Sequence, residues 1–310
     1  MKVLLIVNSA ASSVTARTRV VIRKALSADH QVTLAETSRR GHAARLAQGA
    51  SNDGTEVVVV LGGDGTLNEA ANGLAGSSTA LAPLPGGSTN VFARTLGLSD
   101  DPIEATAALL EALAERSIKR IGLGDVNGRF FLFHCGIGFD AAVVEQVEKR
   151  GSLKRYAGHP LFIYSAVDTW LRHYDRRHAA FTVVHEDPND AGITDIDAAF
   201  ALFLNTNPYT YLGTRPFDVA PEATLDRPLA VVTVPHLKLI PLTRIAMASL
   251  RDGATLRNNK AVDYRVDITS VTVKGHRPFP YQVDGDYLGD VDELRIAHRP
   301  EILDLVVPVD

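Results

Sequence analysis

Two glycine-rich turns, each between an apolar run and a helix, constrain the fold of this chain more than any other feature. The run V-V-V-V-L at residues 57–61 predicts a fully buried strand. It leads into G-G-D-G-T at 62–66 and then into a helix that the residues L-N-E-A-A open. A second apolar run ends in P-G-G-S-T-N at 85–90, again before a helix. Glycine allows close approach of a ligand, and helix starts offer free N–H groups, so the pair favours a phosphate site.

Asp64, in the first turn, is unexpected at such a place because a carboxylate repels an anion. Its presence is explained if it holds Mg²⁺ or accepts a proton from a hydroxyl nucleophile. A single glycine-rich turn is equally typical of an ordinary strand-to-helix connection. Two such turns, one of them carrying an acid, favour a nucleotide site.

Four motifs in order resemble the diacylglycerol kinase catalytic-domain family, which includes bacterial lipid kinases and the sphingosine and ceramide kinases. They are G-G-D-G-T-L-N-E at 62–69, P-G-G-S-T-N-V-F-A-R-T-L-G-L at 85–98, G-I-G-F-D-A at 136–141 and V-D-G-D at 283–286. The resemblance covers essentially the whole chain. It implies an ATP-dependent lipid kinase that uses Mg²⁺ to transfer the γ-phosphoryl group to a hydroxyl of diacylglycerol or a similar lipid alcohol.

The resemblance also implies which residues contact ATP. In the family, the loop after the first strand and a threonine after the second strand touch the nucleotide, and the glycine turns hold its phosphates. The expected cofactor-binding residues are Asn8, Thr37, Gly62, Gly63, Asp64, Gly65, Thr66, Asn68, Glu69, Gly87, Ser88, Thr89 and Asn90. Taken alone, Thr37 is equally typical of a helix-capping or turn hydroxyl.

Asp284-Gly285-Asp286 places two acids on either side of a glycine, in a turn tight enough to direct both at one point. The spacing alone is more typical of an acidic surface turn. The resemblance aligns Asp286 with the glutamate of the family's Asp-Gly-Glu motif, the proposed proton acceptor. We therefore expect Asp286 as the general base with Asp64 as its rival, and Asp64 and Asp284 as ligands of a catalytic Mg²⁺.

Asp140 matches a family acid associated with the acceptor substrate, although an acid in a helix's first turn is also explained by the helix dipole. Two positions depart from the family pattern. Val91 stands where an aspartate is frequent, and Arg227 stands where bacterial members have a ligand of a structural Mg²⁺. The sequence therefore predicts no structural metal at Arg227.

Strands alternate with helices through residue 118, which predicts a parallel sheet whose carboxyl ends carry the ligand site. From residue 119 short alternating strands, including a hairpin with an Asn127-Gly128 turn, predict an antiparallel β-sandwich domain. We thus expect an α/β kinase domain at 1–118, of the type found in NAD kinases and diacylglycerol kinases, and a β-rich substrate domain at 119–298. Family precedent implies that the tail, about 299–310, returns to the first domain.

Composition limits the partners. The net charge of −4 argues against nucleic-acid binding, and the single cysteine, Cys135, fits a reducing cytoplasm. No stretch approaches the roughly 20 apolar residues of a membrane span. A lipid substrate is then met at the inner membrane face by a cytoplasmic enzyme. Basic and aromatic residues at 139–173, including Lys154 and Arg155, suit anionic headgroups, although a solvated face over a core stripe fits the same pattern.

Two other functions stay open. A non-catalytic nucleotide or lipid sensor of the same fold fits the altered Asn90-Val91 and Asp286 positions. An NAD kinase shares G-G-D-G-T, but the β domain lacks the Ser-Thr-Pro-Thr-Gly-Ser-Thr-Ala-Tyr-type stretch of those enzymes. The oligomeric state is not readable from the sequence, so a homodimer is neither favoured nor excluded.

Overall fold

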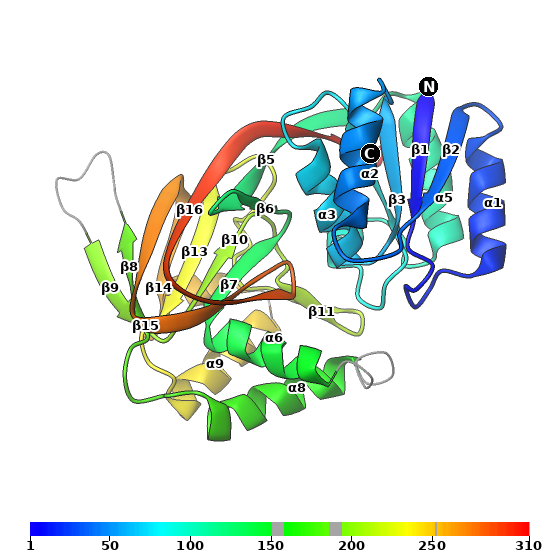
Figure 1. Ribbon diagram of the computed structural model, residues 1–310. Helices are drawn as coiled ribbons and strands as arrows, with labels where there is room; N and C mark the ends of the chain where they lie inside the picture. The colour runs from blue at the N-terminus through cyan, green and yellow to red at the C-terminus, as the bar shows by residue number, and fades with distance from the viewer. Residues whose placement is uncertain (151–157, 186–193, 252, 310) are drawn as a thin grey trace. The chain divides into compact units, whose positions relative to one another are not determined.

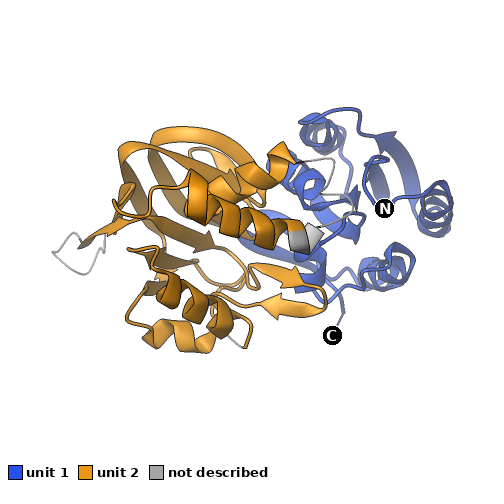
Figure 2. Ribbon diagram, turned by 90° about the horizontal axis from the view of Figure 1, so that it is seen from below, with its two compact units in different colours: residues 1–123, 300–310 blue, residues 124–299 orange. Residues whose placement is uncertain are grey.

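The computed structural model describes residues 1–150, 158–185, 194–251 and 253–309, so the basic residues Lys154 and Arg155 lie outside the described residues. The chain forms two compact units, coloured separately in Figure 2. Unit 1 comprises Met1–Leu123 and Pro300–Asp310, and unit 2 comprises Gly124–Arg299.

Unit 1 is built on a parallel sheet with the strand order β2 (Gln31–Glu36), β1 (Lys2–Val7), β3 (Val57–Gly62) and β4 (Ala80–Pro85), as Figure 1 shows. Every residue of β3 and β4 is buried, as the continuous apolar runs predict. Parallel pairing brings the ends of β3 and β4 level, with Gly62 opposite Pro85. The two glycine turns therefore leave the sheet side by side, and the predicted α/β architecture is confirmed.

Five helices connect the strands of unit 1: α1 (Ala16–Leu26), α2 (His42–Asn52), α3 (Asp64–Leu74), α4 (Val91–Thr95) and α5 (Pro102–Ala114). Buried residues of α1 and α5 share one core with the sheet. The Asp101 carboxylate caps α5 by accepting hydrogen bonds from the Ile103 and Glu104 amides. Helix α3 begins at Asp64, three residues before the start predicted from the sequence, so Asp64 lies in its first turn.

The C-terminal tail completes the sheet of unit 1, as expected. Leu305 pairs in parallel with Leu81, and the Gly76 amide donates to the Ile302 carbonyl at 2.7 Å. The paired part of the tail belongs to a single long strand, β16 (Asp286–Val306). The sequence predicted short strands in this part of the chain, and β16 is longer because its backbone stays extended through polar residues.

Unit 2 is an antiparallel, strand-rich unit, as predicted. One path of its sheet runs β14 (Asp263–Ile268), β13 (Leu229–Val234), β10 (Phe200–Leu204), β7 (His134–Gly138), β15 (Ser270–Val283) and β16. The other end of β15 pairs with β8 (Phe181–His185), which pairs with β9 (Thr194–Ala198). The Asn127-Gly128 turn, with φ of 49° and 86°, joins β5 (Ile118–Val126) to β6 (Arg129–Phe131). A small hairpin consists of β11 (Thr210–Leu212) and β12 (Arg215–Phe217).

Helices cover part of unit 2. They are α6 (Phe139–Lys149), α8 (Gly158–Asp168), the π-helical segment η1 (Thr169–His173), α9 (Leu239–Ser249) and the 3-10 segment η2 (Ala254–Asn258). Helix α9 was not predicted from the sequence. Within the described ranges, no helix has the length and apolar character needed to cross a membrane.

Candidate active site

The two glycine turns of unit 1 pack against each other backbone to backbone. A Cβ atom at Gly86 would lie 2.7 Å from the Gly62 nitrogen, and one at Gly87 would lie 2.8 Å from the Gly63 Cα. Real Cβ atoms do not approach backbone so closely. The glycines are therefore required first by the contact between the turns, which fixes both turns as one surface at the end of the sheet.

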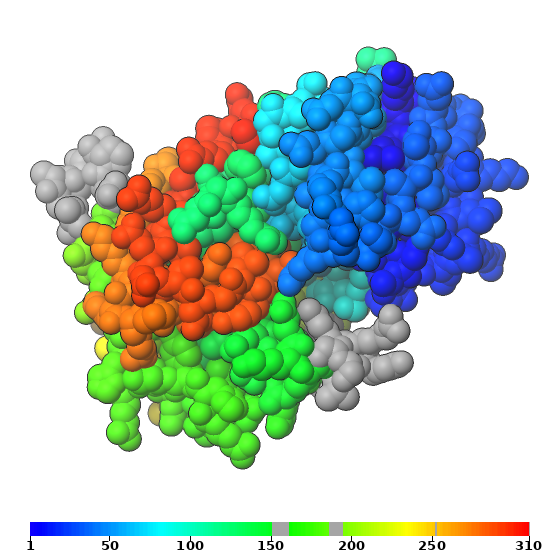
Figure 3. Space-filling model, in the orientation of Figure 1, coloured from blue at the N-terminus to red at the C-terminus, as the bar shows by residue number. Residues whose placement is uncertain are grey.

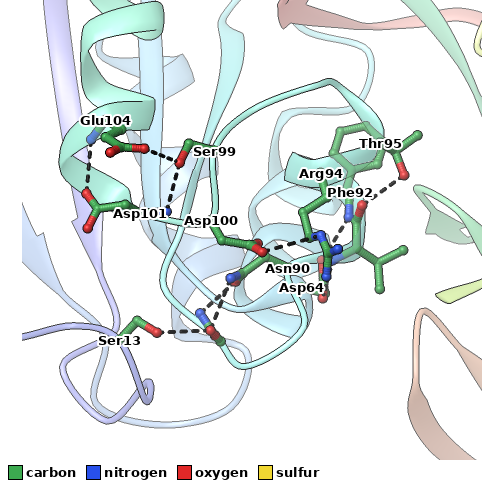
Figure 4. Close-up of polar contacts among 12 residues, drawn as sticks. Ser13, Asp64, Asn90, Phe92, Arg94, Thr95, Ser99, Asp100, Asp101 and Glu104 are labelled. Atoms are coloured by element: carbon green, nitrogen blue, oxygen red, sulfur yellow. Dashed lines mark hydrogen bonds and ion pairs between the residues drawn. The ribbon is translucent and has the colours of Figure 1, made fainter. Parts of the chain in front are cut away.

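The carboxylate of Asp64 ties the first turn to the second. Its two oxygens accept hydrogen bonds from the Val91 amide at 3.0 Å and the Phe92 amide at 3.1 Å. These amides open the short helix α4, where backbone N–H groups lack intrahelical acceptors. Figure 4 shows Asp64 directed at this helix start. Asp64 thus has an evident structural role in addition to the metal or base role expected from the sequence.

Asn90 closes the second turn on itself. It adopts the left-handed conformation with φ 50°, and its side-chain oxygen accepts from the Gly86 amide at 3.2 Å and the Gly87 amide at 2.7 Å. Its side-chain nitrogen donates to the Gly87 carbonyl at 3.1 Å, and the Ser13 hydroxyl donates to the same carbonyl at 3.2 Å. The side chain of Asn90 therefore shapes the loop.

The other residues expected to contact ATP divide into two groups. Asn8 and Thr66 hydrogen-bond each other at 2.9 Å, while Glu69 accepts from the Gly41 and Ala43 amides at the start of α2. Asn68 is buried, so these groups stabilise the unit itself. The second group, Thr37, Gly63, Gly65, Ser88 and Thr89, is half-buried or exposed. In the first group Asn8, Thr66 and Glu69 are also half-buried, so part of each stays accessible.

In unit 2 the Asp-Gly-Asp segment forms the two-residue turn between β15 and β16. Asp284 and Gly285 have φ of 47° and 82°, and Val283 pairs with Asp286, as in a type I′ hairpin. The Asp284 side chain points into the unit. It accepts hydrogen bonds from the amides of Leu132 at 2.8 Å and of Phe133 and His134 at 3.0 Å each.

The two acids of this turn therefore have different environments. Asp284 is buried and holds the segment between β6 and β7, so it is not a solvated surface acid. The side chain of Asp286 is 22% exposed and lies 3.5 Å from the Arg129 guanidinium. Of the pair, Asp286 is the carboxylate with access to a bound molecule.

Asp140, at the start of α6, is the centre of a buried polar cluster. It accepts hydrogen bonds from the Tyr209 hydroxyl at 2.6 Å and the Gln282 amide nitrogen at 2.8 Å. Burial raises the pKa of Asp140, and these two donors oppose that rise. Gly136 is required beside it, because a Cβ there would lie 1.8 Å from an Asp140 oxygen.

Gln282 connects Asp140 to the hairpin turn, because its side-chain oxygen accepts from the Gly285 amide at 2.8 Å. Sequence reasoning missed Tyr209 and Gln282. They lie 69 and 142 residues from Asp140, and no local pattern marks either one. The His134 ring lies 4.4 Å from the Tyr209 ring, and burial lowers the pKa of His134 to about 3.

Cys135 is buried beside this cluster, and its burial raises the pKa of the thiol. Reactive cysteines have a lowered thiol pKa and some exposure. The environment therefore supports a packing role for Cys135.

Within the described ranges, no three acidic, histidine or cysteine side chains form a group that could hold a metal ion. Arg227 instead pairs through two nitrogens with the carboxylate of Asp267, with Nε 2.9 Å from Oδ1. A guanidinium therefore lies in the segment where related bacterial proteins were expected to bind Mg²⁺.

Comparison with known proteins agrees with this geometry. Residues 2–126 match the family described as "Diacylglycerol kinase catalytic domain". The curated protein "Probable lipid kinase YegS-like" of Pseudomonas aeruginosa is 34% identical over 52% of this chain and 51% of its own length. A protein of the same name from Pseudomonas fluorescens is 27% identical over 95% of this chain and 91% of its own length.

The chain thus spans about half the length of the first of these relatives. A crystal structure described as a diacylglycerol kinase from Bacillus anthracis superposes with a TM-score of 0.72 at 20% identity. The superposition covers 99% of this chain and 96% of that one. It confirms the fold over the whole length.

Proposed function

Because residues 2–126 match the family described as "Diacylglycerol kinase catalytic domain", we propose that this protein is an ATP-dependent lipid kinase. It transfers the γ-phosphoryl group of ATP to a hydroxyl of diacylglycerol or a similar lipid alcohol. The observation that carries the proposal is the pair of facing glycine turns, linked by Asp64, in a chain that also has the Asp-Gly-Asp hairpin.

The turns of unit 1 suit the phosphates of ATP. The Gly63–Thr66 turn ends β3 at the start of α3, where first-turn amides have no intrahelical acceptors. Ser88 is exposed in the neighbouring turn, and Thr66 and Thr89 add hydroxyl donors. Phosphoryl transfer depends mainly on positioning and charge neutralisation, so a fixed loop surface matches its needs.

Mg²⁺ is part of the proposal as the partner of the ATP phosphates. Protein sites commonly hold this ion through one or two carboxylates together with substrate phosphates. Asp64 and Asp284 were the ligands expected from the sequence. Their oxygens already accept backbone N–H groups, so Asp64, which is half-buried, keeps more capacity for a metal than the buried Asp284.

Asp286 is the proposed general base. A carboxylate that accepts the hydroxyl proton of the acceptor must be reachable, and Asp286 is the accessible acid of its turn. Asp284 and Gln282 are proposed to position this turn, through their bonds to the 132–134 backbone and to Gly285. Asp140 is proposed to act at the acceptor.

The test is transfer of label from γ-labelled ATP into a total bacterial lipid extract with Mg²⁺ present. The wild-type protein should yield a labelled lipid, and its chromatographic mobility identifies the acceptor. Asp286→Asn and Asp64→Asn should lose the product, with circular dichroism confirming that both variants fold. Unchanged labelling by both variants would refute the assigned site.

A non-catalytic sensor is the second candidate, because Val91 and Asp286 depart from the family pattern. It predicts measurable ATP binding with no labelled product from any lipid pool. The labelling experiment therefore separates the two candidates.

A further inference from the structure

The exposed large hydrophobic side chains of unit 2 gather on two helices. In the part of unit 2 that the structure describes, they are Ile163, Tyr164, Val167, Leu171, Leu239, Ile240 and Met247. The first four belong to α8 and η1, and the last three belong to α9. Exposed apolar residues are normally scattered singly, so this grouping requires an explanation.

Helical spacing places these residues on one side of each helix. In α8 and η1, Ile163, Val167 and Leu171 follow at intervals of four, and the buried residues Leu161, Ser165 and Asp168 occupy the opposite side. Ile163 is 56% exposed and Val167 is 53% exposed. The inner side of the helix thus packs on unit 2, while a second apolar stripe faces outward.

Helix α9 repeats the pattern. Leu239, Ile240 and Met247 are exposed, whereas Ile245 and Ser249 are buried. The segment just before α9 contacts η1, because the Trp170 indole donates to the Leu237 carbonyl at 3.0 Å. The two stripes are therefore parts of one surface. Figure 1 shows α8 and α9 at the same end of unit 2, and the α8 segment, coloured green, forms part of the surface in Figure 3.

Basic side chains border this surface. Arg176, Arg177, Lys238 and Arg244 are exposed and form no ion pair with any described residue. The Arg176 guanidinium stacks over the Trp170 ring at 4.0 Å, and Arg172, 72% exposed, is 3.4 Å from Asp168. The exposed acid there, Asp175, pairs with Arg277 and His178. A positive border on a chain of net charge −4 selects an anionic partner.

An open pocket of about 460 Å³ lies where the two helical segments meet. It is lined by Trp170, Tyr174, Arg176, Arg177 and Lys238, among others. Two arginines and a lysine beside an indole suit a phosphate headgroup at the level of a membrane interface.

We propose that α8, η1 and the outer side of α9 form a docking surface for an anionic lipid bilayer. Apolar residues of the two stripes enter the headgroup region, while the four unpaired basic residues bind lipid phosphates. The proposal deepens the proposed function, on which it rests for a lipid acceptor. Vesicle binding is measured without nucleotide, so the docking surface and the proposed function can fail independently.

The test is flotation of the purified protein with phosphatidylcholine vesicles, with and without phosphatidylglycerol. One double variant, Ile163→Ser with Ile240→Ser, removes apolar groups, and a second, Arg177→Ser with Lys238→Ser, removes charge. All four side chains are exposed, so folding should be preserved. The matched control is Arg17→Ser with Val20→Ser on α1, where both residues are also exposed.

Wild type and control should float with the anionic vesicles, and each double variant should bind them roughly tenfold or more weakly. Raising the salt concentration should release the wild-type protein from the anionic vesicles. Phosphorylation of a water-soluble short-chain diacylglycerol should be the same in all four proteins, which separates docking from catalysis. Anionic-vesicle binding by the double variants equal to that of wild type, or no binding of wild type to anionic vesicles, would overturn the proposal.

Discussion

Unit 1 and unit 2 each contain an aspartate whose carboxylate accepts hydrogen bonds from consecutive backbone amides of another segment. In unit 1, half-buried Asp64 binds two amides 27 and 28 residues further along the chain. In unit 2, buried Asp284 binds three amides 150 to 152 residues back. The same type of interaction, a carboxylate bound to consecutive backbone amides, therefore joins residues close in the sequence in unit 1 and residues far apart in unit 2.

The difference teaches that an aspartate in a glycine turn can organise a site without touching substrate. Around the half-buried Asp64, water can replace a lost carboxylate oxygen as the acceptor, so the free energy of unfolding should fall only a little. Where they are buried, each unpaired amide retains its full desolvation penalty. The predictions that follow test this contrast.

Asp284→Ala should have the largest effect. It leaves three buried amides without an acceptor and places alanine at a φ of 47°, so the free energy of unfolding should fall by about 3 kcal/mol or more. Urea denaturation measures the change. Asp286→Ala, at the more exposed end of the same turn, is the matched control and should cost about 0.5 kcal/mol or less. Equal losses would remove the distinction between the two acids.

Gly86→Ala should have the next largest effect, because the new Cβ would lie 2.7 Å from the Gly62 nitrogen. Forcing the turns apart should lower stability by about 1–3 kcal/mol and weaken ATP binding, as calorimetry can measure. Gly49→Ala in α2 is the control, since nothing lies within 4 Å of its Cβ position. There alanine should stabilise the protein by about 0.5–1 kcal/mol. A stabilised Gly86→Ala would contradict the facing-turn geometry.

Acid should destabilise unit 2 through His134. Burial lowers its pKa from 6.5 to about 3, so the unfolded chain binds more protons between these values, and stability falls as the pH drops below 6.5. One pH unit below 6.5 should cost about 1 kcal/mol. The lowered pKa of His185 also makes the protein less stable as the pH falls. The raised pKa of Asp140 has the opposite effect on stability.

His134→Phe keeps an aromatic ring beside Tyr209 and removes the titration. Unfolding curves measured at several pH values should therefore be flatter below pH 6.5 for this variant than for wild type. An unchanged slope would assign the acid sensitivity to other groups.

Asp64→Asn should have the smallest effect on stability, about 0.5–1 kcal/mol, because one side-chain oxygen remains for the Val91 or Phe92 amide. Thermal unfolding gives the value. A loss as large as that of Asp284→Ala would show that the two carboxylates are equivalent after all.

The contrast also explains how much could be predicted from the sequence. In unit 1, buried strands end in glycine turns within a short stretch, so the parallel sheet and the neighbouring turns follow from periodicity and parallel pairing. The sequence placed the start of α3 too late. Asp64 lies in the first turn of α3, but its carboxylate accepts a hydrogen bond at the start of a different helix, α4. The structural role of Asp64 required knowledge of where Val91 lies.

In unit 2, the sequence predicted short antiparallel strands and the tight Asp-Gly turn, but not the side chains that meet there. Tyr209 and Gln282 reach Asp140 from distant segments, and neither belongs to a motif. Helix α9 was missed because its outward side is apolar, which removes the alternation that marks a surface helix. These features depend on packing between residues far apart in the chain, which local patterns in a single sequence do not reveal.

The last residues of the chain have a consequence for biosynthesis. The sheet of unit 1 uses Leu305 beside Leu81, and Asp304 pairs with Arg120 at 3.1 Å. A ribosome that has finished residue 123 must still translate more than 170 residues before this strand emerges, which takes roughly 10–35 s. During that interval the edge of β4 that later pairs with β16 stays unpaired. Nascent chains should therefore complete the sheet of unit 1 only late, and variants that cannot pair Leu305 with Leu81 should leave this edge open.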